Sequence, residues 1–144
     1  MYVGDISSVD YKALADFRYQ IRKFLHFSEE AARAEGLEPQ QHQMLLAIKA
    51  LDDTCGPTVG HLAEHLLIRH HSAVGLIDRL EERQLVRRVR AIDGDRRQVS
   101  VQMTREGEDK LRRLASVHRS ELLTSDPGLV KALQALLEGK NEKI

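Results

Sequence analysis

The residues with the clearest chemistry lie at the turn of a predicted β-hairpin. Residues 86–103 alternate apolar and polar side chains around Asp93-Gly94, a dipeptide typical of tight turns between strands. Asp95, Arg96 and Arg97 follow this turn. Guanidinium groups on an extended hairpin can reach phosphates or a minor groove, so the tip is a candidate DNA contact. The alternative is that both arginines are simply solvated at a hairpin tip.

Arginine is concentrated in the same part of the chain. The 144 residues carry 22 basic and 22 acidic side chains, for a net charge of zero. From Arg69 to Arg105, however, nine arginines stand against five acidic residues, and lysine is absent. Because arginine makes forked contacts, this segment indicates binding to acidic partners inside the fold or to phosphates and guanine edges. Arg88 and Arg90 are expected to pack against the hairpin or to reach phosphate.

A helix with a polar face is predicted just before the hairpin. From His70 to Gln84, apolar residues recur at the spacing of one buried helical face. The opposite face could read bases in a major groove. Gly75 on that face either permits a close approach to DNA or is a tolerated weakness, since a mid-helix glycine costs ~1 kcal/mol against alanine. The two histidines could instead be solvated or cap the helix. The candidate contacts are His70, His71, Ser72, Gly75 and Arg79.

The elements around these residues follow a definite order. A short helix capped by Thr58, the helix from His70 and the hairpin together describe a helix-turn-helix with a wing. Apolar stripes on the first and the last two predicted helices exceed what such a small core can cover, and therefore predict an interface. The remaining helices are predicted from about Asp10 to Glu35 with Gly36 closing it, from Pro39 to Asp52-Asp53, after the capping residue Thr104, and from Asp126-Pro127 onward through Leu137.

These residues resemble the MarR family of bacterial winged-helix regulators. The resemblance implies a mainly α fold with a small β-hairpin wing, in a single domain over residues 1–144. Residues 39–103 would form the winged helix-turn-helix region, and residues 1–36 and 104–144 the dimerisation helices. The matching residues are Leu62-Ala63, Ile77-Asp78-Arg79-Leu80-Glu81, Leu85-Val86, Asp95-Arg96-Arg97, Val101, Met103-Thr104 and Gly107.

The resemblance also implies roles for particular residues. Arg97 would enter the minor groove, while Asp95 would hold the shape of the wing by pairing with a nearby arginine. The chain departs from the family at Gly75, where a polar or basic residue is common, and at Leu67, where a glycine is common. A small aromatic effector would bind between the dimer helices and the winged domain. Phe24, Phe27, Met44 and Ile48 could line that cavity, although they fit an ordinary core equally well.

The resulting expectation is a homodimeric, sequence-specific regulator of transcription that reads a pseudo-palindromic operator in double-stranded DNA. A repressor whose DNA binding is modulated by a small molecule is favoured. The alternatives are a winged-helix protein-interaction module without DNA binding, or a metal-sensing regulator. Enzymatic activity is not expected, because the sequence offers no nucleophile with a paired base and no glycine-rich phosphate loop.

Cofactor, metal and membrane signals are weak. His61 and His65 stand one helical turn apart and could chelate zinc, but no third ligand is evident, so neither a metal nor a cofactor is expected. Cys55, the single cysteine, is interpreted as a neutral loop residue rather than a redox switch. No stretch is apolar enough to span a bilayer, and no signal peptide is recognisable, so a cytoplasmic protein without a membrane partner is expected.

Overall fold

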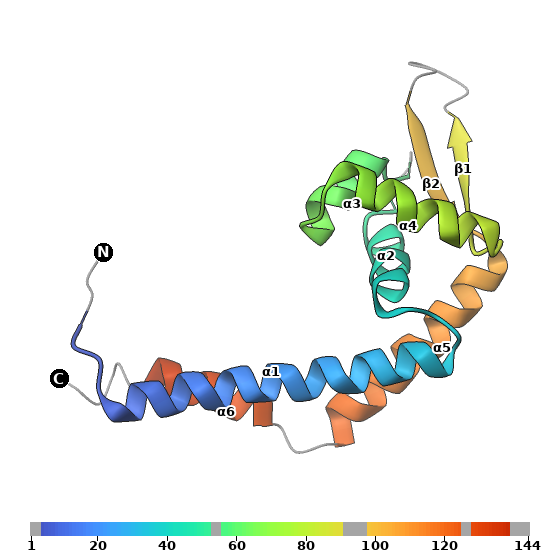
Figure 1. Cartoon of the computed structure of the whole chain (residues 1–144). Coiled ribbons are helices and arrows are strands. Elements are labelled where there is room, and N and C mark those ends of the chain that lie inside the picture. The colour runs from blue at the N-terminus through green and yellow to red at the C-terminus, as the bar shows by residue number, and fades with distance from the viewer. Residues whose placement is uncertain (1–3, 53–55, 91–97, 125–127, 139–144) are drawn as a thin grey trace. The chain divides into compact units, whose positions relative to one another are not determined.

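Helices dominate the computed structural model, which describes residues 4–52, 56–90, 98–124 and 128–138. Within these residues six helices accompany a single pair of antiparallel strands (Figure 1), which confirms the expected fold class. None of these helices is long and apolar enough to cross a membrane. The elements are α1 (Ser8–Ala34), α2 (Pro39–Ala50), α3 (Val59–Leu66), α4 (His70–Glu82), β1 (Val86–Arg90), β2 (Val99–Met103), α5 (Arg105–Thr124) and α6 (Gly128–Glu138).

The chain divides into two compact units. Residues Ala31–Val117 form the first, here called the winged-helix unit, which contains α2, α3, α4 and both strands. The described residues of 1–30 and 118–144 form the second, here called the helical unit. Both α1 and α5 contribute residues to each unit.

The core of the winged-helix unit is built from the apolar faces that the sequence predicts. Met44 and Leu45 of α2, Leu62 of α3 and Ile77 of α4 are all fully buried. Burying a side chain of this kind stabilises a fold by ~1.5–3 kcal/mol. This core therefore fixes which face of α4 points inward and which stays at the surface.

Polar caps set where the helices begin. The Thr58 hydroxyl accepts a hydrogen bond from the His61 N–H, and the Thr104 hydroxyl accepts one from the Gly107 N–H. Glu38 and Gln41 form a reciprocal capping box ahead of α2, which starts at Pro39 as expected. Both threonine caps agree with the sequence-based predictions.

Two left-handed residues shape the connections on either side of α4. Leu67 joins α3 to α4 with φ 57°, and its side chain is 92% exposed. Gln84 has φ 60° and follows the end of α4, which stops at Glu82. The helix is therefore two residues shorter than the predicted stretch, because the chain leaves helical geometry to enter β1.

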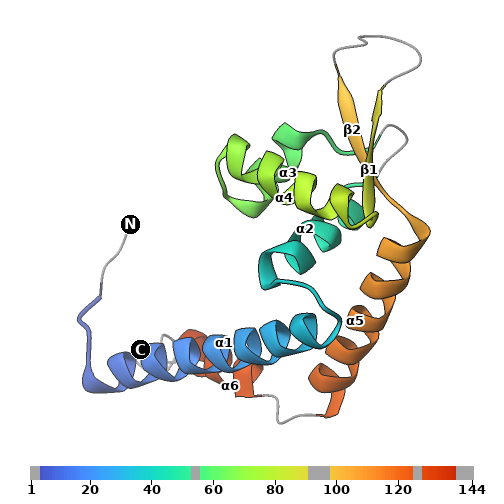
Figure 2. The same cartoon turned by 45° about the vertical axis from the view of Figure 1, so that its right-hand side comes forward.

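The chain segment just before α3 is hydrogen-bonded to the outer edge of β2. β1 and β2 pair with Val86 opposite Met103 and Arg88 opposite Val101. On the other edge of β2, the Val101 N–H donates to the Pro57 carbonyl at 2.8 Å, and Thr58 bridges to Ser100. Figure 2 shows the hairpin standing beside α4, within the winged-helix unit.

Aromatic contacts between half-buried rings join α1 and α5 in the helical unit. Phe24 and Phe27 of α1 make T-shaped contacts with the His118 ring, with ring centroids 6.1 and 5.4 Å away. The His118 Nε2 lies 2.8 Å from the Ser28 hydroxyl, which is buried. Several large apolar side chains of this unit remain exposed, among them Val9, Tyr11, Leu14, Leu122, Leu123, Val130, Leu133 and Leu137.

Candidate nucleic-acid interface

The predicted base-reading residues gather on the outer side of α4. His70, His71, Ser72 and Arg79 are exposed, and Gly75 is half-buried among them. Ala73, Ile77 and Leu80 on the opposite side are fully buried. The helix is therefore anchored by one face while the other is free to enter a groove. Contact of these residues with DNA stays a prediction.

Packing inside the protein does not demand a glycine at position 75. A Cβ built on Gly75 would lie 3.4 Å from the Arg79 Nη2, the mobile end of a long side chain, in ordinary contact. Gly107 differs, because a Cβ there would overlap the carbonyl oxygen of Leu85. Packing inside the protein therefore requires a glycine at position 107 but not at position 75.

Asp95, Arg96 and Arg97 lie outside the described residues, and the roles assigned to them stay predictions. The described strands end at Arg90 and resume at Val99, so the structure places only the base of the wing.

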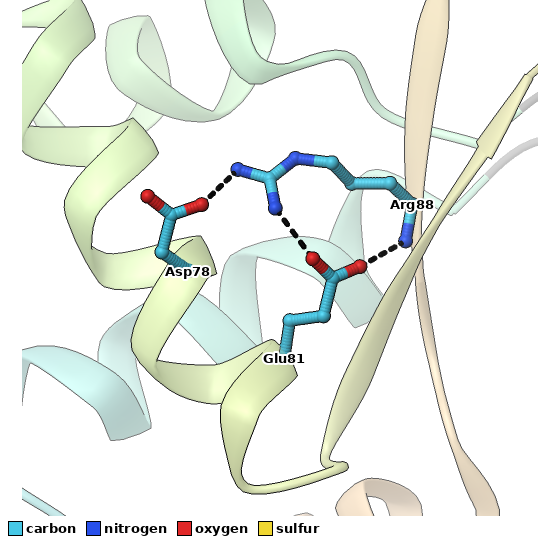
Figure 3. Close-up of polar contacts among 3 residues, drawn as sticks. All are labelled: Asp78, Glu81 and Arg88. Atoms are coloured by element: carbon cyan, nitrogen blue, oxygen red, sulfur yellow. Dashed lines mark hydrogen bonds and ion pairs between the residues drawn. The ribbon is translucent and has the colours of Figure 1, made fainter.

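Arg88, at the base of the wing, binds two carboxylates of α4 (Figure 3). Its Nη2 lies 2.6 Å from an Asp78 oxygen, and its Nη1 lies 2.7 Å from the Glu81 Oε1. The second Glu81 oxygen accepts the Arg88 backbone N–H at 3.0 Å. Glu81 therefore fixes both the side chain and the backbone of the same β1 residue.

These contacts change the acidity of Arg88. Burial of the guanidinium opposes its charge and lowers the pKa, and this is the largest single effect. Hydrogen bonds to Asp78 and Glu81, together with the charges of both carboxylates, act in the opposite direction and leave the pKa raised above its ordinary value. The contacts with Asp78 and Glu81 therefore favour the charged form of Arg88.

Sequence reasoning did not identify this cluster. Arg88 was expected to pack against the hairpin or reach phosphate, whereas it reaches across to α4. A usable signal was present, because Asp78 and Glu81 are three residues apart and so share one side of a helix. The more general expectation of acidic partners within the fold for this arginine-rich segment is confirmed at Arg88.

Residues 35–98 match the sequence pattern of the MarR family. This segment contains both helix-turn-helix helices, β1 and the wing residues. Over residues 35–98 the chain is similar to the MarR family.

Several solved structures share this fold. AbsC, a MarR family transcriptional regulator from Streptomyces coelicolor, has 20% identity over 98% of this chain and 100% of its own, with a TM-score of 0.71. A MepR variant from S. aureus bound to an oligodeoxyribonucleotide has 15% identity over 96% and 98%, with a TM-score of 0.64. CouR from Rhodococcus jostii RHA1 bound to p-coumaroyl-CoA has 20% identity over 88% and 90%, with a TM-score of 0.65. Curated protein sequences gave no match.

The four residues considered for a MarR effector cavity lie in different units. Phe24 and Phe27 border a cavity of the helical unit that Gln20, Lys23, Glu121, Leu122 and Leu129 also line. Met44 and Ile48 belong to the core of the winged-helix unit, with exposed fractions of 0% and 2%. Their role in binding an effector stays a prediction.

Among the described residues, the histidines considered for metal binding are not brought into a cluster with other ligands. His61 and His65 are exposed on α3. Within the described residues, no three histidine, cysteine, aspartate or glutamate side chains are arranged to hold a metal ion. Cys55 lies outside the described residues.

Proposed function

We propose that this protein is a MarR-type homodimeric repressor of transcription that binds a pseudo-palindromic operator. Each subunit places α4 in a major groove and its wing in the neighbouring minor groove. The observation that carries this proposal is the exposed polar face of α4, held by a buried opposite face beside an arginine-rich hairpin. The MepR variant bound to an oligodeoxyribonucleotide, which shares the fold, supports DNA as the partner.

Exposed apolar side chains support the dimer. Val9 and Tyr11 of α1 are 70% and 66% exposed, and Leu123 of α5 is 73% exposed. Apolar groups at this density on one unit are typical of a surface that a partner covers. A second copy of the chain is the natural occupant, because a two-fold dimer presents two α4 helices to two half-sites about one DNA turn, roughly 34–36 Å, apart.

The proposal includes modulation by a small aromatic ligand. CouR, which shares the fold, was solved with p-coumaroyl-CoA, an aromatic thioester. Ligand binding would favour one dimer geometry over another and so change the separation of the two α4 helices. Phe24, Phe27, Met44 and Ile48 remain the candidate contacts.

The test is a gel shift of the purified protein with DNA from upstream of its own gene, against a scrambled duplex of equal length. Preferential, salt-sensitive binding of the native duplex by a dimer is expected, because phosphate contacts release counterions. Equal, negligible binding of both duplexes would contradict the proposal and favour a protein-interaction module. For the repressor assignment, deleting the gene should raise transcription of a reporter fused to that upstream DNA.

A further inference from the structure

Helix α4, which we propose as the recognition helix, carries a net negative charge, although its proposed partner, DNA, is also negative. Residues His70–Glu82 contain one arginine, Arg79, against three carboxylates, those of Asp78, Glu81 and Glu82, a net charge of −2 with neutral histidines. DNA carries one negative charge per ~1.7 Å of its axis, so an acidic helix entering a groove is repelled. Some other group has to offset this charge.

Asp78 is the carboxylate placed most unfavourably. It follows Gly75 by three residues and His71 by seven, so all three share the outer side of the helix. Its side chain is 54% exposed, which means that a DNA molecule against this face would meet it directly. Left alone, Asp78 would stand among the candidate base-reading residues as a fixed negative charge.

We propose that Arg88 is a positioning residue for DNA binding that acts as the counter-ion of the recognition helix. It binds Asp78 at 2.6 Å and Glu81 at 2.7 Å from outside the helix, and its own side chain is only 28% exposed. Arg88 thus works through the α4 carboxylates rather than by touching DNA. The cluster of the three side chains carries one net negative charge instead of two.

The arrangement also keeps the cation in place. The Glu81 carboxylate accepts hydrogen bonds from the Arg88 guanidinium and from the Arg88 backbone N–H. Moving β1 away from α4 would therefore break charged hydrogen bonds. The forked guanidinium reaches both carboxylates at once, which a lysine ammonium matches less well. This inference rests on the proposed DNA-binding function, and concerns how that site is made compatible with DNA.

The test is a double-mutant cycle on operator affinity, measured by fluorescence anisotropy with full-length protein. Arg88→Gln should weaken binding about ten-fold, because two uncompensated carboxylates then face phosphates. Arg88→Gln combined with Asp78→Asn restores the net charge of the cluster and should recover most of the affinity. Arg88→Lys keeps the positive charge but loses the forked guanidinium, so its operator affinity should lie between those of the wild type and Arg88→Gln.

Arg87→Gln is the matched control, because Arg87 is the neighbouring, exposed arginine of the same strand. Because Arg88 already binds Asp78 in the Arg87→Gln variant, Asp78→Asn should recover a smaller part of the loss there than in the Arg88→Gln variant. Melting temperatures of all variants separate folding from binding. An unchanged affinity for Arg88→Gln, or a loss that Asp78→Asn does not recover while the variants stay folded, would overturn the inference. A wild-type protein that fails to bind its operator would instead refute the proposed function.

Discussion

Leu67 occupies a backbone position that suits glycine better than leucine. It is left-handed, with φ 57°, and its almost fully exposed side chain gains little from packing. A left-handed conformation costs an L-residue roughly 1–2 kcal/mol. Glycine avoids this cost, but part of the gain is lost because glycine raises the conformational entropy of the unfolded chain. Leu67→Gly should therefore raise the free energy of unfolding by about 1 kcal/mol, measured by urea denaturation.

His65→Gly is the control for this substitution. His65 is an exposed residue of α3 with helical geometry, so glycine there should lower the free energy of unfolding by about 1 kcal/mol. Destabilisation by both substitutions would show that the left-handed turn imposes no strain on Leu67.

Gly75 gives a second residue-level prediction. Because a Cβ meets only the flexible end of Arg79, Gly75→Ala should raise the free energy of unfolding by up to about 1 kcal/mol through better helix propensity. The same methyl group stands on the outer face of α4, and we expect it to weaken operator binding. Denaturation and anisotropy on one preparation measure both effects. A variant that is more stable and binds unchanged would mean that DNA does not approach Gly75 closely.

At the level of elements, the sequence was sufficient wherever a local signal marks a boundary. Thr58 and Thr104 cap α3 and α5 as predicted, and Pro39 begins α2. Gly36, with φ 76°, closes α1 just after Ala34. Such signals depend on a few neighbouring residues and their hydrogen bonds, so they can be read without knowledge of the tertiary fold.

The contacts that the sequence did not reveal join segments that are far apart in the chain, or a strand with a helix. The Ser28 and His118 pair is separated by 90 residues, and neither residue belongs to a motif that predicts the other. Arg88 was assigned to the correct strand, but its partners lie on α4, and strand alternation gives a face rather than a partner. The candidate α4 side chains His70, His71, Ser72 and Arg79 are exposed, as the helix pattern predicts.

The helix and the wing should contribute differently to DNA recognition. Arg79→Ala or His71→Ala is expected to cost ~1–3 kcal/mol on the operator and little on a scrambled duplex, if these side chains reach base edges. Arg97→Ala should weaken binding to both duplexes, because minor-groove and phosphate attraction is largely independent of sequence. Titrations of each variant with both duplexes separate the two roles. Unchanged affinities for Arg97→Ala would exclude the proposed wing contact.

At the level of the whole molecule, the exposed apolar residues of the helical unit predict where subunits meet. Ending the chain after Ser120 removes α6 and the end of α5, which carry Leu123, Val130 and Leu137. The truncated protein should be a monomer by light scattering while keeping the circular dichroism expected of a folded winged-helix unit. A truncated protein that still dimerises would place the interface elsewhere.

The hydrogen bond between β2 and the chain before α3 has a consequence for amide hydrogen exchange. Since the Val101 N–H is bonded to the Pro57 carbonyl, 44 positions earlier, solvent reaches it only when the chain before α3 separates from β2. Val101 should then exchange at the rate of the global unfolding reaction, together with the buried amides of α4. Arg90, at the other end of the hairpin, should exchange by local opening, orders of magnitude faster. The described strands thus contain two kinetic regions, one around Val101 that opens only with the whole unit and one at Arg90 that opens locally.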